Sequence, residues 1–222
     1  MRLEIDVAGE LVQVAVSRVV NAGYSGRDES AVQEHIDELV ADGIAAPEQV
    51  PATYAVAPNS LRAEPDAIQV VGNDTAGEAE FGLVLAGGET YVVAASDQTD
   101  RALERESVQK AKQITPNVLS REAWRLSDVQ QHWDEIELRA WTTVDGERRR
   151  YQEDPLAALL APGDILDVVH GRYGTADGGE VVLSGTVATI EGEVQPGSRF
   201  EVELVDPVRE RSLSVAYDVE TL

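Results

Sequence analysis

The chain has 222 residues and carries 41 acidic and 18 basic side chains, a formal net charge of −23 at pH 7. Such a charge repels the phosphates of nucleic acid, which argues against a nucleic-acid partner. The absence of cysteine excludes disulfides and thiolate metal sites. No apolar run approaches the length of a membrane span, and the alternating N-terminus lacks a signal peptide's apolar region. We therefore expect a cytoplasmic protein with no membrane contact.

Lysine is almost absent from the chain. Among the 18 basic residues only Lys110 and Lys112 are lysines. An acidic, lysine-poor surface is typical of halophilic proteins, in which concentrated salt screens the self-repulsion of the charge. We therefore predict a halophilic protein, and we expect a specific role for at least one of the two lysines.

The first 65 residues are predicted to form a hairpin, a helix and a connection. Residues 2–21 alternate apolar and polar side chains on either side of Gly9, which predicts a β-hairpin. A glycine-containing loop follows, and Asp28 or Ser30 is expected to cap a helix. Four prolines between residues 45 and 66 predict an irregular connection.

Residues 66–222 are predicted to form the core, with a strand over 68–71 and a hairpin as its centre. The arms of this hairpin, 75–86 and 89–97, are joined by Gly87 and Gly88. A glycine pair between strand-like runs indicates a two-residue turn, because glycine readily adopts positive φ.

Three carboxylates are expected to converge on one face of this hairpin. Pairing outward from the turn places Glu78 opposite Asp97, and side-chain alternation puts Glu80 on the same face as Glu78. Opposed like charges on neighbouring strands are destabilising, and hard divalent cations prefer oxygen ligands. The hairpin therefore predicts half of a Mg²⁺ (or Mn²⁺) site.

The rest of the chain is predicted to alternate short helices with strands. The expected helices span 99–113, 128–133 and 155–160, and the expected strands span 135–144, 148–152, 181–187, 199–205 and 209–219. We expect a turn at 162–164 and a flexible surface loop over the glycine-rich segment 171–179. The predicted fold class is α+β, mostly β, in a single domain, 1–222.

Two further motifs carry chemistry. Asp97, Thr99 and Arg101 occupy alternate positions, so their side chains point to one face while the chain stays extended. Downstream, residues 184–186 end a predicted strand in a small, hydroxyl-rich turn. Backbone N–H groups and a hydroxyl in such a turn can hold a carboxylate.

In their order along the chain, these motifs resemble the fumarylacetoacetate hydrolase family. That family carries an E-x-E strand, a motif close to N-D-x-S-x-R-D, a lysine after a helix, a strand of the form G-D-x-I-x-T-G-T-P, and a P-G-D turn. The similar segments here are Glu78–Glu80, Ser96–Arg101, Lys110, Gly179–Val187 and Pro196–Ser198. Residues 21–28 are loosely similar to the family's G-L-N-Y-R-D-H loop, and Gln152 to a glutamine that follows its N-G turn.

The resemblance implies a rolled mixed β-sheet with a few short helices, usually a homodimer, with a divalent metal on Glu78, Glu80 and Asp97. The implied activity acts on a small 2-oxo acid or 1,3-dicarbonyl acid through a metal-stabilised enolate, by C–C hydrolysis, decarboxylation, hydration or tautomerisation. The residues implied for catalysis are Lys110 and Arg101, and those for substrate binding are Tyr24, Arg27, Gln152, Gly185 and Thr186.

The chain departs from the family pattern in the N-terminal loop. Hydrolytic members carry a His–Glu pair there, whereas this chain has Glu29 and Val32, and His35 could substitute only if its helix turned it inward. The alternative is therefore a catalytically inactive relative that binds an oxo acid or another metabolite as a sensor or scaffold. A salt-adapted structural protein without a site is a third interpretation, and the sequence does not decide between Lys110 and Lys112.

Overall fold

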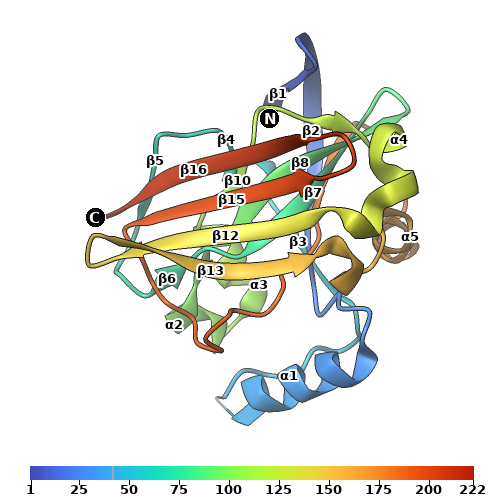
Figure 1. Cartoon of the computed structure of the whole chain (residues 1–222). Helices are drawn as coiled ribbons and strands as arrows, with labels where there is room; N and C mark the ends of the chain where they lie inside the picture. Colours follow the sequence, from blue (N-terminus) through green and yellow to red (C-terminus); the bar gives the residue numbers. More distant parts are fainter. Residues whose placement is uncertain (42) are drawn as a thin grey trace.

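Two packed β-sheets make up most of the computed structural model, which describes residues 1–41 and 43–222 (Figure 1). The predicted class, α+β with mostly β, is confirmed by this architecture. Within the described residues, no helix has both the length and the apolar character that crossing a membrane requires.

The first sheet is mixed and curls on itself. Its strand order is β1-β2-β14-β7-β8-β10-β4, with β3 beside β2 and β11 beside β8. The strands are β1 (Arg2–Val7), β2 (Glu10–Gly23), β3 (Ala52–Val56), β4 (Leu61–Ala63), β7 (Ala79–Ala86), β8 (Glu89–Asp97), β10 (Asn117–Leu119), β11 (Trp124–Arg125) and β14 (Gly179–Leu183).

The second sheet covers the outer face of the first. Its strands, in spatial order, are β13 (Glu147–Pro155), β12 (Glu137–Val144), β15 (Arg199–Asp206), β16 (Arg211–Thr221) and β5 (Ala67–Val70). A two-stranded ladder of β6 (Thr75–Ala76) and β9 (Thr99–Asp100) lies beside the central hairpin.

Two apolar cores follow from the alternation of side chains along the strands. One core fills the space between the sheets and includes Phe81, Leu83 and Val202. The other fills the inside of the curled first sheet and includes Val93 and Leu183. Strands β7 and β8 contribute to both cores, so the hairpin that they form is buried on both faces.

The helices are short and lie at the ends and edges of the sheets. They are α1 (Glu29–Ala41), α2 (Arg101–Glu104), α3 (Val108–Ile114), α4 (Leu126–Val129) and α5 (Pro162–Tyr173), with 3-10 turns at Pro58–Ser60, Gln130–Glu135 and Leu156–Ala158. Helix α1 projects from the body (Figure 1), and Ile36 is its buried residue. Asp28 caps it, because its Oδ1 accepts from the backbone N of Ser30 at 3.0 Å.

The predicted central hairpin is confirmed in register. Ala86 pairs with Glu89 across the turn, and Gly87 and Gly88 have φ of +60° and +85°. The backbone N of Glu78 donates to the carbonyl of Asp97 at 3.1 Å, and the reverse bond has the same length. The hairpin therefore presents Glu78 directly opposite Asp97, as the sequence predicts.

Several other local predictions were wrong. The predicted turn at 162–164 is the start of α5, whose Pro162 suits a first helical turn. The predicted loop 171–179 is a loop over 174–178 only, because residues 171–173 end that helix and Gly179 begins β14. The predicted helix 99–113 is two helices, because Asp100 caps α2 and Ser107 caps α3. The connection over 45–66 contains β3 and β4, which pair with β2 and β10.

Candidate metal centre

Three carboxylates meet where the central hairpin ends. One oxygen from each of Glu78, Glu80 and Asp97 lies within 4.8 Å of the others. Glu80 and Asp97 are fully buried, and the side chain of Glu78 is 18% exposed. We call these three residues the acidic triad. The predicted convergence on one face is thus present in the structure.

Two oxygens of the acidic triad lack a hydrogen-bond partner among the described residues. They are Glu80 Oε1 and Asp97 Oδ1, both buried. The other oxygen of Glu80 accepts from the backbone N of Gly185 at 2.8 Å. Buried carboxylate oxygens without a partner are rare and costly. Oxygen-only donors with unused lone pairs suit Mg²⁺ or Mn²⁺, so the triad could bind such a metal.

Lys112 places its ammonium between two members of the triad. Its Nζ lies 3.0 Å from Glu78 Oε2 and 2.5 Å from Asp97 Oδ2, and 3.4 Å from Thr99 Oγ1. Lys112 is buried, whereas Lys110 is exposed. Residues two apart on a helix point to different faces, so α3 presents only one of its lysines to the triad. The structure brings Lys112 to the site and leaves Lys110 outside it.

Arg101 closes the other side of Glu78. Its Nη2 lies 3.2 Å from Glu78 Oε1, and its Nη1 lies 3.0 Å from Glu104 Oε2. The guanidinium is mostly buried, and the backbone N of Arg101 is fixed by the carbonyl of Asp74 at 2.8 Å. Glu78 is therefore held between two cations, one from α2 and one from α3.

The electrostatics of the triad differ from one acid to the next. Burial raises the pKa of Glu78, but Lys112 and Arg101 outweigh it and lower this pKa to about 2. Burial, reinforced by the charge of Asp97, raises the pKa of Glu80 well above its usual range. Burial also raises the pKa of Asp97, more than Lys112 lowers it. A further cation is what would allow all three acids to be ionised together.

Gln152 and Thr186 lie close to the triad and hold the backbone of Ala79, whereas Gly185 bonds the Glu80 side chain. Gln152 Oε1 accepts from the backbone N of Ala79 at 3.0 Å, and Gln152 Nε2 donates to Thr186 Oγ1 at 2.7 Å. Thr186 Oγ1 in turn donates to the carbonyl of Ala79 at 2.7 Å. Ala79 lies between Glu78 and Glu80, so these contacts fix the strand segment that carries both acids.

Tyr24 and Arg27, both expected to bind substrate, have different surroundings in the structure. Tyr24 has a φ of +55°, and burial, with Tyr54 and the charge of Glu104, raises its pKa to about 12. Arg27 is paired with Asp134 at 2.6 Å and donates to the carbonyl of Leu159. The structure therefore does not bring Arg27 to the triad.

His35 lies on α1, with its ring 6.2 Å from that of Tyr24, but its side chain is 61% exposed. In this structure the helix does not turn it inward.

Sequence reasoning missed Asn117, which lies opposite Asp97 in the pairing of β10 with β8. Asparagine is depleted in strands, and Asn117 directly follows Pro116, so the local pattern gave no usable signal for it. The sequence analysis also did not assign Asn21 to the site, although its side chain hydrogen-bonds that of Asn117.

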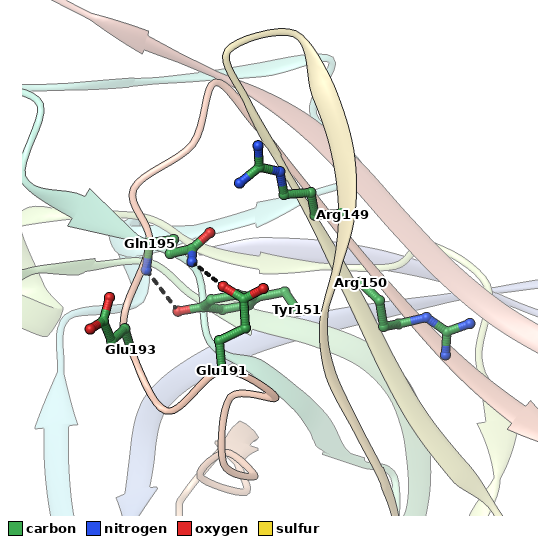
Figure 2. Close-up of a pocket in the computed structure, with 6 residues that line it drawn as sticks. All are labelled: Arg149, Arg150, Tyr151, Glu191, Glu193 and Gln195. Atoms are coloured by element: carbon green, nitrogen blue, oxygen red, sulfur yellow. Dashed lines mark hydrogen bonds between the residues drawn. The ribbon is translucent and has the colours of Figure 1, made fainter.

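Figure 2 shows a hollow beside β13, the strand that carries Tyr151. It is lined by Arg149, Arg150, Tyr151, Glu191, Glu193 and Gln195. The Gln195 backbone N lies 3.4 Å from the Tyr151 hydroxyl, and Gln195 Nε2 donates to Glu191 Oε2. Its volume of about 10 Å³ has room for about one water molecule.

Solved structures similar to this chain share its fold along almost the whole length. A protein from Oleispira antarctica, provisionally described as a fumarylacetoacetate isomerase/hydrolase, has a TM-score of 0.70 at 16% identity, with 97% of this chain and 99% of that chain covered. The 5-carboxymethyl-2-hydroxymuconate delta-isomerase from Mycobacterium smegmatis has a TM-score of 0.66 at 17% identity, covering 97% and 84%. A 2-keto-3-deoxyarabinonate dehydratase has a TM-score of 0.65 at 13% identity, covering 96% and 77%.

These likenesses confirm the predicted resemblance at the level of the fold: the chain has the fold of fumarylacetoacetate hydrolase-type proteins. No curated protein matches the chain in sequence. A family model described as "Protein of unknown function (DUF2848)" matches residues 22–217, which include the whole acidic triad, Lys112 and Arg101. The chain therefore belongs to the DUF2848 family.

Proposed function

We propose that this protein is a divalent-metal-dependent enzyme of the fumarylacetoacetate hydrolase type that acts on a small 2-oxo acid or 1,3-dicarbonyl acid. The observation that carries the proposal is the acidic triad, with its two buried, unpartnered oxygens and its ligand atoms within 4.8 Å of one another. The names of the structural neighbours, an isomerase, a dehydratase and an isomerase/hydrolase, support a site adaptable to several related reactions.

The metal would be held by Glu78, Glu80 and Asp97. When bound, Mg²⁺ or Mn²⁺ would supply Lewis-acid polarisation of a substrate carbonyl and so favour an enolate. Lys112 takes the role first expected of Lys110: its ammonium lies where it can hold a proton beside the developing negative charge. Arg101 fixes the orientation of Glu78 through their contact at 3.2 Å.

The remaining residues would shape the binding of the acid. Gly185 orients Glu80 through its backbone N–H, and Gln152 and Thr186 hold the strand between the two glutamates. We propose that Tyr24 borders the bound acid. Arg27, engaged by Asp134, would anchor the loop that carries Tyr24.

Metal binding by the purified protein tests the proposal directly. Isothermal titration with MnCl₂ and MgCl₂ should show one site per chain, and Glu80→Gln should abolish it, because it removes a ligand charge without changing the side-chain volume. Turnover of acylpyruvates or oxaloacetate should require the metal and fail in the same variant. A wild-type protein that takes up neither metal at millimolar concentration would refute the proposal.

The second candidate function is a catalytically inactive relative that binds an oxo acid as a sensor or scaffold. The observation that favours it is the N-terminal loop, where Glu29 and Val32 stand in place of a His–Glu pair and His35 is largely exposed. Metal and oxo-acid binding without turnover across a broad panel of oxo acids would support this second function.

We also propose that the chain 1–222 acts as one domain, because Asn21 of the first 65 residues bonds Asn117 of the core beside the triad. A homodimer, a cytoplasmic location and adaptation to high salt remain proposals. Sedimentation in molar KCl would test the homodimer.

A further inference from the structure

Two buried asparagines meet beside the acidic triad. Asn21, in β2, and Asn117, in β10, are both fully buried. Their amides pair reciprocally, because Asn21 Nδ2 donates to Asn117 Oδ1 at 2.9 Å and Asn117 Nδ2 donates to Asn21 Oδ1 at 3.3 Å. Asn117 Nδ2 also lies 3.3 Å from the hydroxyl of Ser60. We call Asn21 and Asn117 the amide pair.

The amide pair spans the interior of the curled first sheet. Strands β2 and β10 are separated in the sheet by β14, β7 and β8, so these side chains reach each other across the curl and not along the ladder.

Both asparagines lie close enough to act on Asp97, and Asn21 is also linked to Glu80. Asn117 lies directly opposite Asp97 in the antiparallel pairing, so the two share a face with Cβ atoms about 5 Å apart. Asn21 pairs with Leu183 of β14, two residues before Gly185, whose backbone N–H bonds Glu80. The amide pair therefore connects β10, beside Asp97, to the strands next to Gly185, the residue that orients the Glu80 side chain, whereas the backbones of Glu80 and Asp97 are already joined by the pairing of β7 with β8.

The stability of the fold does not by itself explain why two asparagine amides are buried inside the curled first sheet. The other side chains of this interior include Val19, Leu119 and Leu183, and a hydrogen-bonded buried pair is often no more stable than an apolar pair of similar shape. Asparagine is also unfavourable in strands. What a directional contact adds, and an apolar contact does not, is a fixed separation between β2 and β10.

We propose that the amide pair is a positioning device that holds the Asp97 carboxylate in place relative to the Glu80 carboxylate, and so keeps the three carboxylates within reach of one cation. Neither asparagine is a ligand in this scheme. The inference rests on the proposed metal site and adds to it two residues that act through the triad.

The double variant Asn21→Val/Asn117→Val tests this role, because it removes both amides and leaves neither one unpaired. Its melting temperature without metal is expected at or above that of the wild type. Its affinity for Mn²⁺, measured by isothermal titration, is expected to fall at least about tenfold, as for the loss of groups that orient metal ligands. Unchanged Mn²⁺ affinity in a folded double variant would overturn the proposal.

The single variant Asn117→Val strips Asn21 of its partner and should melt below the double variant. It also provides the Mn²⁺ comparison if the double variant does not fold. Ser120→Ala is the matched control. Ser120 follows β10, is fully buried and bonds the backbone of Ala94 and Glu122, so its loss should lower the melting temperature and leave Mn²⁺ affinity unchanged.

Failure of the inference and failure of the proposed function are separable. A wild-type protein that binds no Mn²⁺ refutes the metal site. Crystal structures of the metal-free wild type and double variant then still test the positioning role. The separation of the Asp97 and Glu80 carboxylates should change in the variant, and an unchanged separation would overturn the inference.

Discussion

Lys112 gives the sharpest quantitative test of how the acidic triad is held together. Its ammonium lies between Glu78 and Asp97 at 3.0 Å and 2.5 Å. The substitution Lys112→Met keeps an unbranched side chain that is shorter by the terminal nitrogen alone, and it removes the charge. Removing one partner of a buried ion pair typically costs about 3–5 kcal/mol, because the remaining charge is left buried and uncompensated. The metal-free variant should therefore lose stability on that scale.

Divalent metal should reverse much of this loss. A unit charge about 4 Å from another interacts by about 4 kcal/mol at an effective dielectric of 20, so removal of the ammonium should favour a cation among the same carboxylates. We expect Lys112→Met to bind Mn²⁺ at least about tenfold more tightly than the wild type, a difference of about 1.4 kcal/mol. Ligand at 100 times its dissociation constant would restore about 2.7 kcal/mol of stability.

Urea denaturation with and without Mn²⁺ measures both effects. Lys110→Met is the matched control: it lies two residues away on the same helix and is exposed, so its stability should stay within about 0.5 kcal/mol of the wild type. Equal stability of the two metal-free variants would refute the reasoning. So would a gain from Mn²⁺ no larger in Lys112→Met than in the wild type.

Two further predictions concern pH and salt. Burial raises the pKa of Asp206, but His132, the backbone N of Arg209 and Arg211 outweigh it and lower this pKa below its usual range. Its contribution is thus present at neutral pH and lost as the pH falls below about 4. In urea melts, Asp206→Asn should cost about 1–3 kcal/mol at pH 7, with a smaller difference at pH 3. A constant difference would contradict the assignment. Since the net charge is −23, the melting temperature of the wild type should rise from dilute buffer to molar KCl. Equal values would refute salt adaptation.

The central hairpin was predictable because its register is a local property. The turn of Gly87 and Gly88 fixes the pairing, and strand alternation then carries Glu78 opposite Asp97 without any knowledge of the rest of the fold. Helix α5 was missed for a related local reason. Pro162 and Gly163 resemble a turn in sequence, but proline at the first helical position starts a helix as readily.

Among the site residues, the choice of lysine was not predictable. Lys110 and Lys112 lie on one short helix, and the phase of that helix relative to the triad is set where α3 packs against its neighbours. Ser107, which caps α3 at its start, fixes where the helix begins. Only the packed structure shows that Lys112 is the buried lysine.

The sequence by itself determined the fold class, the hairpin register and the convergence of three acids, since each depends on residues close along the chain or on an ordered set of motifs. The tertiary structure alone decided that Lys112, and not Lys110, lies against Glu78 and Asp97, and that Asn21 meets Asn117. The contact of Asn21 with Asn117 depends on how far a nine-stranded sheet curls. That curvature results from the small twists between many neighbouring strands and from the packing of both cores, so it cannot be predicted from any short stretch of sequence.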